Sequence, residues 1–164
     1  MDIIKILISW SHTTSAFLSL FLGAFVLFAT KGNEKHRQIG IYYFYLMLIN
    51  NFTALFIFNS FGRWFFPHSL AVATLVIIIP GYLITLKKEY KHWLKIHITS
   101  FTISYYLLIG GAINEVFLRY KPLMMYKVGS PQNGMSQFAA MVLFTVILIY
   151  FLIKYRRNKF NFKK

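Results

Sequence analysis

Histidine side chains are the groups in this 164-residue chain that are best suited to carry chemistry. His12 and His68 each lie near the start of a long apolar run, at equivalent positions 56 residues apart. Two imidazoles on facing helices can ligate a metal ion or both axial positions of a haem iron. A substrate, proton or quinone site and plain hydrogen bonding between helices are the other roles that these residues suit. His12 and His68 are therefore candidate ligands of haem b or a metal.

A second group of histidines lies in or beside two short basic segments: His36, His92 and His97. His12 and His36 are 24 residues apart, which is about 36 Å along a continuous helix, so they cannot share one site. We expect His36 to pair with His92 or with His97. Stacked pairs of histidines that ligate haem would pass electrons through a helical bundle. The alternative is that His36, His92 and His97 are solvated loop residues or contact lipid headgroups.

Glu115 is the one acidic residue inside an expected membrane span, where an ionisable side chain is costly and usually has a partner. Arg119, four residues later, can form a simple i,i+4 ion pair with it. Further candidates are Arg63, Asn50 and Asn51. Because adjacent helical residues point about 100° apart, we expect at least one of the two amides to hydrogen-bond across a helix interface. We also expect His12, His68 and Glu115 to converge on one site in the outer half of the membrane.

The composition indicates a bilayer protein, because 57% of the residues are hydrophobic and only 13% are charged. The net charge of +14 comes from lysines and arginines between apolar runs and at the C-terminus. This placement favours contact with anionic lipid headgroups over nucleic-acid binding. The chain has no cysteine, so it has no disulfide, thiolate metal site or cysteine nucleophile.

Five apolar stretches predict an all-α integral membrane protein with spans at residues 3–30, 40–60, 68–86, 96–117 and 136–155. The 56-residue offset predicts that the first four helices are two parallel hairpin repeats, 3–63 and 64–119, that form a four-helix bundle. In this single domain, residues 1–164, an outer loop at 119–136 precedes a peripheral fifth helix and basic tail at 136–164. His12, Ser15, Ser19 and Gly23 follow helical spacing and predict a small-residue face for close helix contact.

The distribution of basic residues predicts the orientation. Thirteen of the eighteen lysines and arginines lie in residues 31–37, 87–95 and 154–164. By the positive-inside rule these segments are cytoplasmic, which puts the N-terminus outside and the C-terminus inside. The expected location is a bacterial inner membrane.

A motif in the first hairpin allows a comparison with known families. It reads K-G-x-x-x-H-R-x-x-G and comprises Lys31, Gly32, His36, Arg37 and Gly40, with Met47 following and His92 in the second basic turn. With these residues, positions 10–120 resemble the bacterial membrane family catalogued as domain of unknown function 2306. The second half departs from the motif, because Trp93 stands where the first copy has Arg37. The resemblance implies a multi-pass membrane protein and supplies no reaction.

The placement of the histidines is also similar to the bis-histidine four-helix core of cytochrome b561-type proteins, which implies haem b. The preferred hypothesis is thus a small redox subunit that ligates haem or a metal through histidine. The alternative is a transporter, binding or assembly protein that has a protonatable His/Glu site and no cofactor. Either one is compatible with partner membrane subunits or with a second copy of the chain. Whether the protein is an enzyme is left open.

Overall fold

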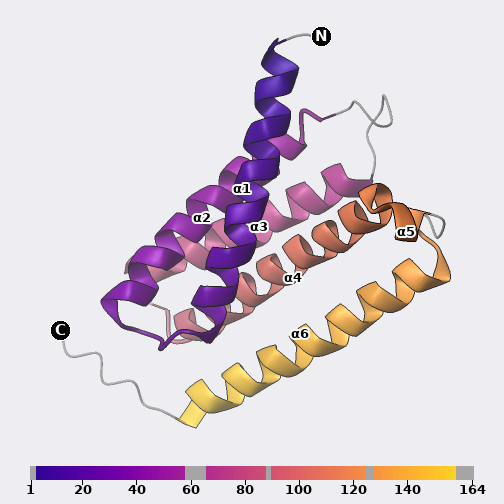
Figure 1. The fold of residues 1–164 in the computed structure, drawn as a ribbon. Coiled ribbons are helices and arrows are strands. Elements are labelled where there is room, and N and C mark those ends of the chain that lie inside the picture. Colours follow the sequence, from indigo (N-terminus) through magenta and orange to yellow (C-terminus); the bar gives the residue numbers. More distant parts are fainter. Residues whose placement is uncertain (1–2, 58–65, 88–89, 125–127, 158–164) are drawn as a thin grey trace. The chain divides into compact units, whose positions relative to one another are not determined.

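The computed structural model describes residues 3–57, 66–87, 90–124 and 128–157, and the regular structure in these ranges is helical throughout (Figure 1). The helices in chain order are α1 (Ile3–Phe28), α2 (Glu34–Ala54), α3 (Phe66–Lys87), α4 (Trp93–Arg119), α5 (Lys121–Met124) and α6 (Pro131–Arg157). The all-helical expectation is confirmed for the described residues.

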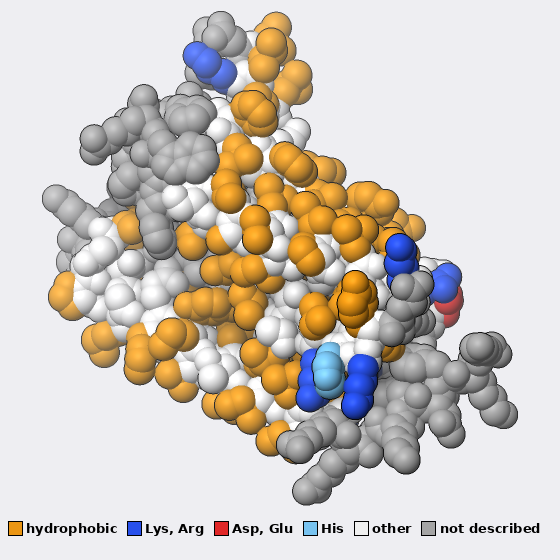
Figure 2. Space-filling model, turned by 180° about the vertical axis from the view of Figure 1, so that it is seen from behind, with side chains coloured by type: hydrophobic (Ala, Val, Ile, Leu, Met, Phe, Trp, Pro, Cys, Tyr) orange, Lys and Arg blue, Asp and Glu red, His pale blue; other side chains and the backbone are white. Residues whose placement is uncertain are grey.

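Four helices, namely α1, α3, α4 and α6, are long and apolar enough to cross a membrane. The segment expected to be the second span forms a helix, α2, but α2 is not among these four. Its first turns are polar, and two buried asparagines lie near its end. Hydrophobic side chains are spread across the face shown in Figure 2, and lysine, arginine and histidine side chains lie near its margin. Such a surface suits contact with lipid tails.

The chain divides into two compact units, which we name the N-terminal unit (Met1–Ile79) and the C-terminal unit (Pro80–Lys164). The boundary falls at Pro80, inside α3. Proline has no amide hydrogen, so α3 lacks one backbone hydrogen bond at this point. The arrangement of two repeats and the four-helix bundle both stay predictions.

In the N-terminal unit, α1 and α2 form an antiparallel pair joined by a tight turn. Gly32 takes a positive φ of 83°, and the side chain of Asn33 caps α2 by accepting a hydrogen bond of 2.8 Å from the His36 amide. The Lys31 ammonium donates to the Leu27 carbonyl at 2.6 Å and so caps the last turn of α1. Because Asn33 provides this cap, α2 begins at Glu34, six residues earlier than the apolar pattern indicated.

The small residues of α1 lie in the core of this unit. Ser15, Ser19 and Gly23 are all buried, as the helical spacing of these residues predicts. The opposing core residues of α2 include Tyr43 and Met47, each only 1% exposed. The burial that the helical spacing of these small residues predicts is confirmed.

In the C-terminal unit, α6 packs along α4. The ring of Phe144 on α6 lies 5.6 Å from that of Tyr105 and 5.9 Å from that of Tyr106 on α4. Helical structure extends into the segment expected to be a loop, since α5 forms and α6 begins at Pro131 instead of residue 136. Ser130 provides the cap, because its hydroxyl accepts from the Asn133 amide at 3.3 Å and Pro131 follows as the first helical residue.

Candidate functional site

The imidazole of His12 on α1 contacts the last turn of α2. Its Nδ1 atom lies 2.9 Å from the backbone oxygen of Asn50 and 3.4 Å from the Oγ1 atom of Thr53. His12 itself is half-buried. This contact joins residues 38 positions apart in the chain. It holds the ring against the C-terminal part of α2.

The chemistry of the acceptor assigns the proton on the His12 ring. A backbone carbonyl only accepts hydrogen bonds, so Nδ1 of His12 must carry the hydrogen and donate it to Asn50. In the neutral ring, Nε2 then holds the lone pair. Nε2 of His12 makes no hydrogen bond to any residue in the described part of the chain. The same hydrogen bond to a backbone carbonyl often orients histidines that bind metals.

Asn50 and Asn51 are both buried in the N-terminal unit, at 7% and 6% exposure. The Nδ2 group of Asn51 donates a hydrogen bond of 2.7 Å to the Met47 carbonyl of its own helix. The Oδ1 atom of Asn50, in contrast, is buried with no hydrogen-bond partner among the described residues, and so is the Oγ atom of Ser19. Buried polar atoms of this kind are rare and need a partner such as water or a ligand.

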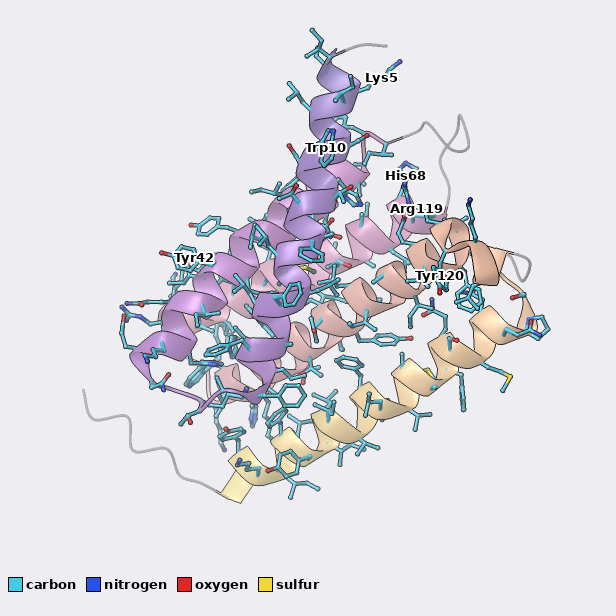
Figure 3. The ribbon with its side chains drawn as sticks, in the orientation of Figure 1. Lys5, Trp10, Tyr42, His68, Arg119 and Tyr120 are labelled. Carbon is cyan, nitrogen blue, oxygen red and sulfur yellow. The ribbon has the colours of Figure 1, made fainter. Side chains whose placement is uncertain are left out.

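His68 is the third residue of α3 and is 3% exposed. His12 and His68 both belong to the N-terminal unit. Figure 3 labels His68 at the start of α3 and Trp10 on α1. Arg63 falls outside the described residues. The pairing of His12 with His68 stays a prediction.

The three other histidines have different surroundings. His36 is half-buried in the first turn of α2, and His92 is exposed before α4, where its side chain makes no capping hydrogen bond. The Nδ1 atom of His97 lies 3.2 Å from the backbone oxygen of Gly81, and its ring packs 4.5 Å from that of Phe101. His97 therefore has the same kind of backbone anchor as His12, within the C-terminal unit.

Glu115 forms the ion pair with Arg119 that their spacing on α4 allows. The two side chains are 53% and 80% exposed, so solvent or lipid headgroups reach both of them. Exposed pairs of this kind contribute little to stability. The expected convergence of Glu115 with His12 and His68 stays a prediction.

A cluster of amides that the sequence pattern did not reveal joins α4 to α6. Asn114 Oδ1 accepts from Asn133 Nδ2 at 3.1 Å and from Gln137 Nε2 at 3.0 Å, and Gln137 Nε2 also donates to the Gly110 carbonyl at 2.9 Å. Asn133 is 4% exposed, and its Oδ1 accepts from the Gly129 amide at 3.2 Å. The i,i+4 spacing of Asn133 and Gln137 was the available sequence signal.

Among the described residues, no three histidine, aspartate or glutamate side chains gather closely enough to hold a metal ion. Comparisons with curated proteins and with solved structures give no match for this chain. They therefore lend no support to the likeness to cytochrome b561-type proteins. A family model does match, over residues 9–153. This match covers most of the chain, including α2 to α5 and most of α1 and α6. The protein therefore belongs to the family of predicted membrane proteins described as DUF2306.

Proposed function

We propose that this protein is a small redox subunit of the membrane in which His12 ligates the iron of a b-type haem. The observation that supports this proposal is the hydrogen bond of 2.9 Å from Nδ1 of His12 to the Asn50 carbonyl. It leaves the Nε2 lone pair available on a ring whose orientation is fixed. A preoriented imidazole loses little rotational freedom on binding and is a better ligand for that reason.

The number of candidate ligands favours haem over a bare metal ion. A structural zinc ion usually takes four protein ligands and a catalytic one takes three, but the described residues contain no group of three. A haem brings nitrogen ligands of its own, so the protein would have to supply fewer side chains to hold it. His12 and His68, which both belong to the N-terminal unit, would hold it. Bound haem would supply one-electron transfer, and the protein would hold it and exclude water.

A cofactor-free binding or transport protein is a second candidate, and one observation favours it. Asn50 Oδ1 and Ser19 Oγ are buried without partners among the described residues. Both atoms can accept hydrogen bonds, and both lie in the hairpin of α1 and α2. A polar ligand that carries hydrogen-bond donors would satisfy them.

We further propose the location and partners of the protein. The basic segments 31–37 and 87–95 and the basic tail would face the cytoplasm of a bacterial cell and contact anionic lipid headgroups. The N-terminus would then lie outside. Partner membrane subunits or a second copy of this chain would complete an electron-transfer path.

The absorption spectrum of the purified protein from haem-replete cells separates the two candidates. The redox proposal expects b-type haem bands and stoichiometric iron, with the bands lost in a His12→Ala variant. Thr13→Ala is the matched control, because Thr13 is the exposed neighbour of His12 on α1. Colourless wild-type protein without iron would reject the redox proposal and favour the cofactor-free alternative.

A further inference from the structure

Thr53 of α2 is the second residue that contacts the protonated nitrogen of His12. Its hydroxyl oxygen lies 3.4 Å from Nδ1 of His12, 2.7 Å from the Ile49 carbonyl and 3.0 Å from the Asn50 carbonyl. A threonine hydroxyl has one hydrogen to donate. Both carbonyls can only accept, so they share this hydrogen in a three-centre bond. The Thr53 oxygen therefore presents a lone pair to His12.

The two groups that contact Nδ1 are consequently both acceptors. The Asn50 carbonyl accepts at 2.9 Å, and the Thr53 hydroxyl provides a longer second contact. A lone pair on Nδ1 would meet two oxygen lone pairs at this position, which is unfavourable. The hydrogen on Nδ1 is therefore stabilised by both of them.

We propose that Thr53 is a positioning residue that holds His12 in the Nδ1–H tautomer and directs its Nε2 lone pair to the ligand. Thr53 is half-buried in the last turn of α2, and its bond to the Ile49 carbonyl locks its own side chain. The Asn50 carbonyl is bound at the same time by Thr53 and by His12, so threonine, carbonyl and imidazole form one small network. This inference rests on the proposed role of His12 as a ligand.

The chemistry of this network defines the class of ligand. An imidazole whose hydrogen is committed to Nδ1 offers an electron pair at Nε2, so it binds an electron-pair acceptor such as haem iron. Removing an oriented partner of this type commonly weakens metal binding by about 10- to 100-fold.

The first experiment measures the tautomer of His12 without any ligand. Protein with ¹⁵N-labelled histidine is placed in lipid nanodiscs at alkaline pH, and the His12 signals are assigned by their loss in His12→Ala. We expect the Nδ1–H tautomer in the wild type and in Thr53→Ser, which keeps the hydroxyl. Thr53→Val keeps the shape but has no hydroxyl, so the His12 ring loses one of its two contacts at Nδ1. We expect part of the population in this variant to turn away from the Asn50 carbonyl and to carry the hydrogen on Nε2.

The second experiment titrates haem into the same apo-proteins. We expect Thr53→Val to bind haem about tenfold more weakly than the wild type, and Thr53→Ser to bind like the wild type. Circular dichroism and thermal unfolding establish that both variants are folded. If Thr53→Val does not fold, Thr53→Ala replaces it.

The outcomes separate the two proposals. A wild-type His12 with its hydrogen on Nε2, or a folded Thr53→Val with an unchanged tautomer, would overturn the positioning role. Binding of haem that is equal in wild type and Thr53→Val would overturn it as well. If the tautomer shifts as expected while the wild type binds no haem, the positioning role stands and the redox function fails.

Discussion

Gly81 of α3 and Ser100 of α4 approach so closely that a Cβ atom added at Gly81 would lie 2.3 Å from the Cβ atom of Ser100. Both residues are buried in the C-terminal unit. Real Cβ atoms essentially never show such a contact, so only glycine fits at position 81. The same contact brings the Gly81 carbonyl to Nδ1 of His97.

Gly81→Ala should therefore lower the free energy of unfolding by about 1–3 kcal/mol, the usual effect of forcing extra atoms into a packed interface. Gly111→Ala is the matched control on α4, because a Cβ there meets nothing within 4 Å. It should be neutral or stabilising by up to about 1 kcal/mol, since alanine favours helix. Ser100→Gly should rescue Gly81→Ala. Thermal unfolding in detergent measures these effects, and a Gly81→Ala variant as stable as wild type would contradict the contact.

The amide cluster should hold α6 against α4. In Asn114→Ala, the buried Nδ2 group of Asn133 loses the acceptor to which it donates at 3.1 Å. We expect a loss of about 1–3 kcal/mol, which is typical of a buried donor left unsatisfied. Gln132→Ala is the control, because Gln132 is the exposed amide next to Asn133. Equal melting temperatures of the two variants would argue against a structural role for the cluster.

The topology of α2 gives a third prediction. We expect α2 to cross the membrane as well, in addition to the four candidate spans. It packs antiparallel along α1, which is long and apolar enough to span. Its asparagines are buried, while Tyr45, Ile49 and Phe52 are exposed as lipid contacts would be. Five spans put the termini on opposite sides of the membrane, and four put them on the same side. A reporter fused after residue 66 should therefore lie outside, and a reporter fused at the C-terminus should lie in the cytoplasm.

The histidines give a fourth prediction. If His12 and His68 both hold the haem, His12→Ala and His68→Ala should lose the haem bands to the same extent, because each variant would remove one of the two side chains that bind the iron. Thr13→Ala should retain the bands. Optical and paramagnetic resonance spectra of the purified variants measure the loss. Retention of haem by His68→Ala with unchanged spectra would remove His68 from the site.

Local spacing in the sequence was sufficient for several features. The length and composition of the apolar runs predicted long helices, although α2 is too polar to be identified as a span by hydropathy. The spacing of Ser15, Ser19 and Gly23 predicted a buried face, because one helical turn repeats every 3.6 residues. The Glu115–Arg119 ion pair follows from i,i+4 spacing alone.

The contacts between helices depended on the tertiary structure. The partner of His12 is a backbone oxygen 38 residues away, and every residue has such an oxygen, so no sequence pattern indicates which one is used. The register between α1 and α2 determines which backbone oxygen His12 contacts. That contact in turn determines which nitrogen of His12 holds the lone pair. The amide cluster likewise needs α4 and α6 in one register, which brings Asn114 to Asn133, 19 residues later. Helical periodicity determines which residues share a face, but only packing determines which residues of two faces meet.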